Sequence, residues 1–445
     1  MITQGSVSMP ESKAPPSLKR ELDLRGAILV GLGSMVGTGV FVSIGIAAGV
    51  AGTSVILAVA IAALLAACNG LSSAQLAANH SVSGGTYEYG YRYLTPWLGF
   101  TAGWMFLLAK TASAATAALG FAGYLLNALR LDATQWLVPL ALVTVVILTL
   151  IVLGGIRRSN LTNLIIVSIT LLSLMIFIIT GLPHVTPGNF TPFFPTDTSD
   201  KRAIASLLHG SALMFVAYTG YGRIATLGEE VHQPRRTIPI AIILTMIITM
   251  ILYMAIAAVG VGSVGVDTLS AATQSNAAPL EVASRQFGIP IVPPFLALGA
   301  MTAMVGVLLN LILGLSRVLL AMGRRRDMPR IVARLNAAGT TPYISVICIG
   351  VAIAALVLIG NVKTTWSFSA FTVLVYYALT NLSALRLSAQ ERLYPKWIAG
   401  VGLAGCLILA FWVEQQIWLV GLGLIVAGLT WKTIVLPLAL GSRNH

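Results

Sequence analysis

Residues 25–52 read RGAILVGLGSMVGTGVFVSIGIAAGVAG, a run long enough to cross the hydrocarbon of a bilayer as one helix. Between its ends the run has glycines at positions 31, 33, 37, 39, 45 and 49. Glycine lets membrane helices pack closely, and it also lets the backbone leave the helical path and approach another group. We therefore expect a membrane helix that is interrupted near Gly37 and Gly39.

The composition of the chain excludes a soluble fold. Of its 445 residues, 57% are hydrophobic and 9% are charged, whereas soluble domains are about 25% charged. Helices can bury such a surface in lipid, because each pairs its own backbone groups. The apolar runs predict an all-α integral membrane protein with twelve spans, at residues 26–50, 53–78, 97–126, 135–154, 160–182, 203–228, 237–262, 291–322, 343–360, 364–386, 396–413 and 415–440. A longer outer loop is expected at 263–290, where APLEVASRQFG has helical spacing.

The basic residues predict how the chain is oriented. The net charge is +13; with the N-terminus inside, sixteen Lys and Arg residues fall in cytoplasmic segments and five in outer loops. Loops rich in Lys and Arg stay on the cytoplasmic side. We therefore expect both termini in the cytoplasm, a cytoplasmic tail at 1–25, and insertion in the cytoplasmic (inner) membrane. This placement makes membrane lipid, and not nucleic acid, the expected partner of the charged loops.

A second interruption is expected in the sixth span. Residues 209–231 read HGSALMFVAYTGYGRIATLGEEV, with Gly220 and Gly222 near mid-depth. Interrupted spans at corresponding places in two halves are typical of transporters built from repeats. The first and sixth spans lie five apart, and because five is odd, the second half would be inverted relative to the first.

Two such breaks would suit a zwitterionic solute. A helix that unwinds at mid-membrane frees amide donors and carbonyl acceptors. The start of the outer half of the first span is electropositive and suits a carboxylate. The carbonyls that end the outer half of the sixth span suit an ammonium group. An α-amino acid presents both groups.

Four segments in order resemble the amino acid–polyamine–organocation (APC) superfamily and its amino acid permeases. They are GSMVGTGVF at 33–41, SSAQLAANHSVSGGTYEYGYRYL at 72–94, FVAYTGYGRIATLGEEVHQPRRTIPIAI at 215–242, and the stretch at 299–345 with its SRVLLAM and TP elements. The resemblance covers roughly residues 20–395. It implies a five-plus-five inverted repeat (the LeuT-like, or APC, fold), with repeats at 26–182 and 203–386 and two additional helices at 396–440.

The resemblance also implies which residues hold the substrate. The carboxylate would meet the first break, mostly through backbone amides, and the ammonium group the second, through carbonyls and an aromatic ring. The residues concerned are Val36, Gly37, Thr38 and Gly39 in the first span and Phe215, Ala217, Thr219 and Gly220 in the sixth. Glu229 and Glu230, near the inner end of the sixth span, are expected to act as gate or loop anchors.

The chain departs from the family at one position. Proton-coupled members carry a lysine in the fifth span, and the segment GIRRSNLTNLIIVSIT places Thr170 there. The sequence therefore puts proton coupling by that route in doubt. Thr170 and Thr302 carry hydroxyls that could serve a sodium ion, or that could bond back to their own helices.

Two charges stand inside predicted spans, where charge is costly and marks function or a buried pairing. Lys110, in the third span, is a candidate proton carrier or fixed cation; alternatively it pairs with carbonyls or snorkels into a vestibule. Arg223 follows the break of the sixth span and could meet a substrate carboxylate or an acidic side chain, or pair with Glu230. His209 is expected to line the outer half of that span, and Arg317 to anchor the inner end of the eighth.

These features together predict a secondary transporter that moves amino acids by alternating access, coupled to a proton, to sodium or to exchange. A polyamine or cationic carrier of the same superfamily is the alternative; the absence of an acid beside the break and the presence of Lys110 and Arg223 argue against it. A membrane sensor that keeps this fold without transport is a further alternative. No nucleophile motif, paired intramembrane carboxylates or filter repeat points to an enzyme or a channel, and no metal or cofactor is expected.

Overall fold

The computed structural model describes residues 22–80, 84–155, 160–194, 200–225 and 231–435. Within these ranges every regular element is a helix, apart from a single parallel bridge between Leu22 and Val231. In the same ranges nine helices are long and apolar enough to cross a membrane, and three shorter apolar helices accompany them. The predicted all-helical membrane architecture is confirmed at this level.

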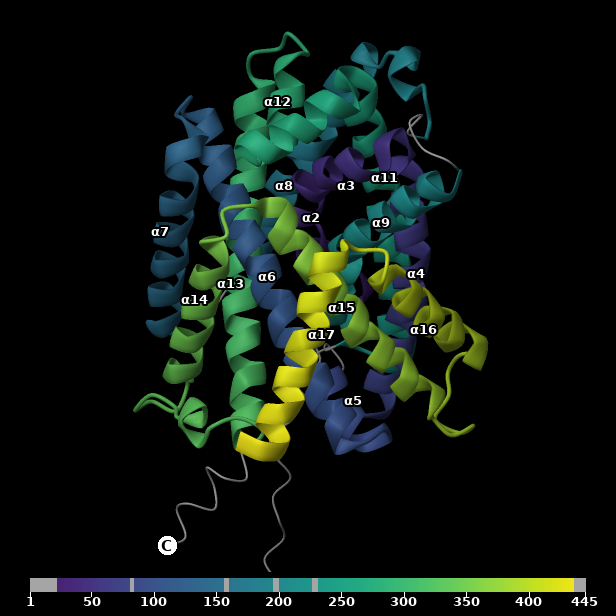
Figure 1. The fold of residues 1–445 in the computed structure, drawn as a ribbon, viewed down its shortest axis with the longest axis vertical. Helices are drawn as coiled ribbons and strands as arrows, with labels where there is room; N and C mark the ends of the chain where they lie inside the picture. Colours follow the sequence, from purple (N-terminus) through teal and green to yellow (C-terminus); the bar gives the residue numbers. More distant parts are fainter. Residues whose placement is uncertain (1–21, 81–83, 156–159, 195–199, 226–230, 436–445) are drawn as a thin grey trace, which may run out of the picture.

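Figure 1 shows most of the helices running between two ends of the molecule, with the short helix α12 at the upper end and α5 at the lower. The helices are α1 (Leu24–Met35), α2 (Thr38–Phe41), α3 (Ser43–Ala51), α4 (Val55–Asn79), α5 (Thr86–Tyr93), α6 (Pro96–Ala128), α7 (Ala133–Leu153), α8 (Asn160–Gly181), α9 (Asp200–Tyr218), α10 (Gly222–Ala225), α11 (Pro234–Asn276), α12 (Pro279–Arg285), α13 (Val292–Arg324), α14 (Tyr343–Val357), α15 (Val362–Leu385), α16 (Lys396–Ala410) and α17 (Gln415–Thr430). Among the described residues six short elements accompany them: η1 (Gly52–Ser54), η2 (Leu182–His184), η3 (Pro187–Phe190), η4 (Thr219–Tyr221), η5 (Arg330–Ala333) and η6 (Trp431–Val435).

The first crossing is broken. Helix α1 ends at Met35, after which Val36 is extended, with φ −79° and ψ 100°, and Gly37 has φ −170° and ψ −132°. Helix α2 begins at Thr38 and is followed by α3. The interruption predicted near Gly37 and Gly39 is therefore confirmed.

The sixth crossing is broken at the predicted place as well. Helix α9 ends at Tyr218, and the tighter 3₁₀ turn η4 follows it before α10 starts at Gly222. A short 3₁₀ stretch between two helices often marks a functional hinge. The chain after Ala225, up to residue 230, lies outside the described residues.

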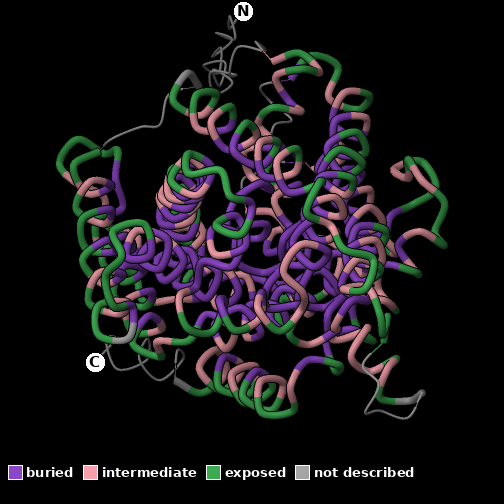
Figure 2. The backbone as a smooth tube through the Cα atoms, turned by 90° about the horizontal axis from the view of Figure 1, so that it is seen from above, coloured by how far each residue is buried: buried purple, intermediate pink, exposed green. Residues whose placement is uncertain are grey.

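The centre of the molecule is built from α6 and α15. In their most apolar stretches 78% and 72% of residues are buried, against 11% for α17. Figure 2 shows the same distribution from above, with buried chain in the middle and exposed chain around it. Small residues on α6 allow this close packing. A methyl group added at Gly120 would lie 2.8 Å from the sulfur of Met304, and a methyl group added at Gly103 would lie 2.6 Å from the ring of Tyr87.

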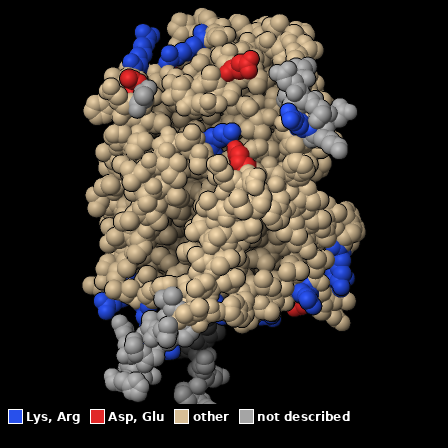
Figure 3. Space-filling view, in the orientation of Figure 1, with Lys and Arg blue, Asp and Glu red and all other residues tan. Residues whose placement is uncertain are grey.

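The outer surface of the helices is apolar, as a lipid-facing surface must be. Large side chains such as Leu64, Ile179 and Val426 are 67%, 68% and 63% exposed. Patches of this kind are rare on soluble monomers. Figure 3 shows that charged side chains on the visible face lie mainly toward its two ends.

The outer segment after the seventh span differs from the prediction. Helix α11 continues to Asn276, so that much of the loop expected at 263–290 is helical. Its direction changes at Gly265, whose φ of 79° and ψ of 164° are open to glycine and strained for other residues. The predicted helical stretch forms α12, and Glu281 within it is only 2% exposed, so α12 packs into the protein instead of lying on its surface.

A buried carboxylate holds together the end of the molecule at which α5 lies. Tyr87 and Tyr91 of α5 both donate to one oxygen of Asp327, at 2.7 and 2.6 Å, and the ammonium of Lys432 lies 3.2 Å from the other oxygen. Asp327 is 5% exposed. This cluster ties α5 and the end of α13 to η6, close to the C-terminus.

Candidate functional site

The two interrupted crossings touch each other at their breaks. A methyl group added at Gly39 would lie 2.6 Å from the Cβ and 2.8 Å from the Cα of Ala217. One added at Gly220 would collide with the backbone carbonyl of Ser34 and would lie 2.7 Å from the amide nitrogen of Met35. Only glycine fits these two positions without displacing backbone, so the glycines bring the two breaks into direct contact.

The first break presents amide groups to its surroundings. Because α2 starts at Thr38, the amides of its first residues have no carbonyl one turn back in the same helix. The bonds that close the new turn run from Val40 and Phe41 to the carbonyl of Gly37, at 3.0 and 3.3 Å. Gly37 faces α13, because a methyl group added at Gly37 would lie 2.7 Å from a methyl carbon of Val307.

Two tyrosines hold the ends of this break. The hydroxyl of Tyr253, on α11, donates to the carbonyl of Met35 at 2.8 Å. The hydroxyl of Tyr124, on α6, donates to the carbonyl of Phe41 at 2.8 Å. Both tyrosine side chains are fully buried. The sequence analysis missed these residues, and their only signal is an aromatic hydroxyl inside an apolar span, which needs a buried partner.

Lys110 reaches the second break. Its ammonium group donates to the hydroxyl of Thr219 at 2.8 Å, and that hydroxyl donates in turn to the carbonyl of Val216 at 2.8 Å. The hydroxyl of Tyr377, on α15, donates to the carbonyl of Thr219 at 3.3 Å. Lys110 is half-buried. The structure thus brings the third-span cation and the unwound part of the sixth span together.

Side chains around the breaks leave polar atoms available. Among the described residues, the hydroxyls of Thr38 and Tyr218 are buried and have no hydrogen-bond partner. Buried polar groups are usually paired, so each such atom needs an explanation. Phe215 is fully buried and packs edge-to-face on Tyr377, with ring centroids 5.7 Å apart.

The two candidate sodium-binding threonines bond to their own helices. The hydroxyl of Thr170 donates to the carbonyl of Ile166 at 2.7 Å. The hydroxyl of Thr302 donates to the carbonyls of Leu298 and Gly299, at 2.9 and 3.0 Å. Each hydroxyl oxygen can still accept a hydrogen bond or ligate a cation, so their assignment to a cation stays a prediction.

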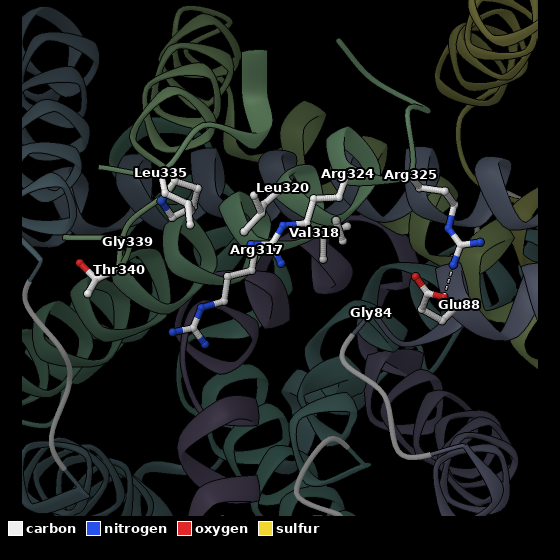
Figure 4. Close-up of a pocket in the computed structure, with 12 residues that line it drawn as sticks. Gly84, Glu88, Arg317, Val318, Leu320, Arg324, Arg325, Leu335, Gly339 and Thr340 are labelled. Atoms are coloured by element: carbon white, nitrogen blue, oxygen red, sulfur yellow. Dashed lines mark hydrogen bonds and ion pairs between the residues drawn. The ribbon is translucent and has the colours of Figure 1, made fainter. Parts of the chain in front are cut away.

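The remaining predicted residues lie on α10 and α13 or outside the described part of the chain. Arg223 is exposed on α10. Glu229 and Glu230 lie outside the described residues, so the expected pairing of Arg223 with Glu230 stays a prediction. Arg317 is exposed on α13 and lines a cavity of about 670 Å³, which Figure 4 shows together with Glu88, Arg324 and Arg325.

His209, on α9, takes part in an ion cluster with Glu414 and Lys363. Its Nε2 lies 3.2 Å from the carboxylate of Glu414, and the ammonium of Lys363 lies 3.3 Å from the other oxygen of that carboxylate. Burial raises the pKa of Glu414, but the His209 side chain, a backbone amide and Ser367 outweigh this effect and lower the pKa to about 2. The cluster joins α9 to α15 and to the turn before α17; the sequence analysis gave Glu414 no role.

Comparisons with known proteins agree with this architecture. The sequence profile of a family described as "Amino acid permease" matches residues 26–437. An uncharacterized transporter of Mycobacterium tuberculosis is 38% identical over 399 residues, which are 89% of this chain and 87% of the relative. The branched-chain amino acid permease BcaP of Bacillus subtilis is 26% identical over 74% of this chain and 72% of its own. The methylthioribose transporter of the same bacterium is 24% identical over 96% of this chain and 95% of its own length.

Proposed function

Because this chain belongs to the amino acid permease family of the APC superfamily, and is therefore a membrane transporter, we propose that it carries amino acids by alternating access. The solute would be held between the broken crossings α1–α2 and α9–η4. The transporter would be secondary, driven by a proton or sodium gradient or by exchange.

The contact between the two breaks is the observation that carries this proposal. The start of α2 offers backbone amides, which suit a carboxylate. The end of α9 offers carbonyls, which suit an ammonium group. Gly39 packs on Ala217 and Gly220 packs on Ser34, so both kinds of group lie within the reach of one small zwitterion. The unpaired hydroxyl of Thr38 lies at the same place.

Lys110 would supply a positive charge beside the substrate. Its contact with Thr219 supports a role either as a fixed cation or as a proton carrier in place of the fifth-span lysine. Arg223 would act further inward, on a carboxylate or an acidic partner. Thr170 and Thr302 would be the sodium ligands if sodium is the coupling ion.

The proposed site requires a particular chain topology. We expect twelve crossings, two inverted five-helix repeats at 26–182 and 203–386, a pair of additional helices at 396–440, and both termini in the cytoplasm. The nine long and three short apolar helices among the described residues support the number of crossings. The basic loops support the orientation in the cytoplasmic membrane.

The relatives leave a second substrate class to be tested. A vacuolar cationic amino acid transporter of Arabidopsis thaliana is 27% identical over 80% of this chain and 61% of its own. A cationic side chain would have to lie near Lys110, and the repulsion in a site of low dielectric would weaken its binding. We therefore favour neutral or acidic amino acids over cationic ones and polyamines.

Uptake into proteoliposomes tests the proposal. The purified chain is reconstituted, and uptake of a panel of labelled neutral, acidic and basic amino acids and polyamines is measured, with proton and sodium gradients imposed separately. We expect accumulation of neutral or acidic amino acids. Binding of an amino acid without any uptake or exchange would instead support the sensor, and uptake of basic solutes alone would support the cationic carrier.

A further inference from the structure

One face of α13 changes its surroundings halfway along the helix. Residues at helical spacing form a single face in its outer half, where Leu296, Gly299 and Ala303 are buried. A methyl group added at Gly299 would collide with Ser173 of α8, and the next turn, at Val307, meets Gly37. In the outer half this face therefore packs against α8 and the first break.

The same face is uncovered in the inner half. It continues through Asn310, Gly314, Arg317 and Arg324, and all four are exposed. An added methyl group at Gly314 would have no atom within 4 Å. Arg317 lies about 15 Å along the helix from Val307, at ~1.5 Å per residue. In the inner half this face is therefore exposed from Asn310 to Arg324.

This inner face does not have the composition of a lipid-facing surface. An asparagine and two arginines in contact with hydrocarbon would be costly, and such residues in membrane proteins face an interior or water-filled space. The uncovered face therefore borders water.

The exposed face borders a cavity of about 670 Å³ at the inner end of α13 (Figure 4). Its lining includes Arg317, Arg324 and Arg325 but only one carboxylate, Glu88. Glu88 pairs with Arg325, whose guanidinium also lies 4.1 Å from the ring centroid of Tyr91. Among the described residues, no carboxylate lies within ion-pair distance of Arg317 or Arg324. The described lining therefore carries an excess of positive charge.

Alternating access requires a water-filled vestibule on the inner side of the transporter. We propose that Arg317 and Arg324, which line the cavity beside α13, form a site in that vestibule for the carboxylate of the solute in transit. This inference rests on the proposed function for the identity of the solute. Low-dielectric walls focus the field of charges into a cleft and raise the local concentration of counter-ions. The guanidinium fork matches a carboxylate in shape and charge. A phosphate group of an anionic lipid has the same chemistry and is the competing occupant.

Cysteine modification tests the vestibule without any transport assay. Gly314→Cys is made in the otherwise native chain, and its modification by an anionic and a cationic methanethiosulfonate reagent is followed by mass spectrometry of the peptide. Ile251→Cys, at a position 60% exposed on the apolar surface of α11, is the control for an exposed site that faces lipid. We expect Gly314→Cys to react and Ile251→Cys to stay unmodified. An unreactive Gly314→Cys would show that this face borders lipid and would overturn the proposal.

The ratio of the rates at which the two reagents modify Gly314→Cys tests the anion site. After correction for their reaction with a free thiol, the anionic reagent should modify Gly314→Cys about tenfold faster than the cationic one, given charges within about 10 Å. Adding Arg317→Gln and Arg324→Gln should remove most of this preference. No preference in the parent, or a preference that survives both substitutions, would refute the anion site.

Two further arms separate the solute from a lipid headgroup. In phosphatidylcholine vesicles, the transported amino acid should slow modification of Gly314→Cys at least threefold, and its carboxamide should not. Slowing that appears only when phosphatidylglycerol is added, with none from the amino acid, would assign the site to lipid and overturn the solute assignment. If uptake fails for every amino acid, the reagent ratio still decides whether the cationic vestibule exists, so the two proposals can fail separately.

Discussion

Gly39→Ala should weaken substrate binding without unfolding the protein. The added methyl carbon would stand 2.6 Å from the Cβ and 2.8 Å from the Cα of Ala217, whereas non-bonded carbons prefer about 3.5–4.0 Å. The two breaks must therefore move apart by roughly 1 Å. Because one neighbour is backbone, a side-chain rotation cannot absorb this change.

Overpacking of this kind costs about 1–3 kcal/mol. If the cost falls on the state in which both breaks contact the solute, the dissociation constant rises about 5- to 150-fold, since 1.4 kcal/mol corresponds to tenfold. The assay is equilibrium binding of the labelled amino acid that gives the highest uptake, with thermal unfolding measured on the same preparation.

Gly400→Ala is the matched control for this substitution. Gly400 lies in α16, and an added methyl group there would have no atom within 4 Å. We expect unchanged binding and unchanged or slightly higher stability, because alanine favours the helix. Binding by Gly39→Ala that equals that of Gly400→Ala would refute the claim that the two breaks share one substrate.

Four other substitutions test separate parts of the account. Lys110→Ala should cut uptake at least tenfold while the protein stays folded, because the charge beside Thr219 is lost; normal uptake would remove Lys110 from the site. Arg223→Ala should also lower uptake, and an unchanged rate would restrict it to a structural role. Tyr253→Phe removes the hydroxyl that donates to the carbonyl of Met35. Because such a hydrogen bond contributes about 1 kcal/mol, substrate binding should weaken about fivefold. An affinity equal to that of the parent protein would show that this hydrogen bond is dispensable. Asp327→Ala leaves Lys432 without its carboxylate partner and should destabilise the protein by about 3–5 kcal/mol, so an unchanged unfolding temperature would contradict the role of the Asp327 cluster.

The sequence predicted the features that depend on local composition. Apolar runs gave the positions of the long helices, and the glycines at 37, 39 and 220 marked both breaks. Lys110 was recognised because a charge in a span is rare whatever surrounds it. Each of these signals lies within one short stretch of the chain.

The missed features depend on contacts between distant segments. Tyr253 lies 218 residues from the carbonyl that it caps, and Glu414 caps a cluster whose histidine is on α9. No periodicity within one helix encodes such a pair. The length of α11 was missed because Gly265 and the polar residues after it suggested a loop, while a single positive φ lets the helix bend and continue.

The uncovered face of α13 was missed for a different reason. Its asparagine, glycine and arginines follow the same spacing as the buried outer half of that face, so the pattern alone gives one continuous stripe. Which neighbours cover each half depends on how α8 and the first crossing pack.

Competition by substrate analogues tests most directly whether unpaired backbone in the two breaks holds a zwitterion. The labelled amino acid is bound to the purified protein and displaced by the parent compound, its carboxamide, and its N-acetyl derivative. The account predicts that both analogues compete at least a hundredfold more weakly than the parent, because each removes one charged end. Equal competition by either analogue would contradict it.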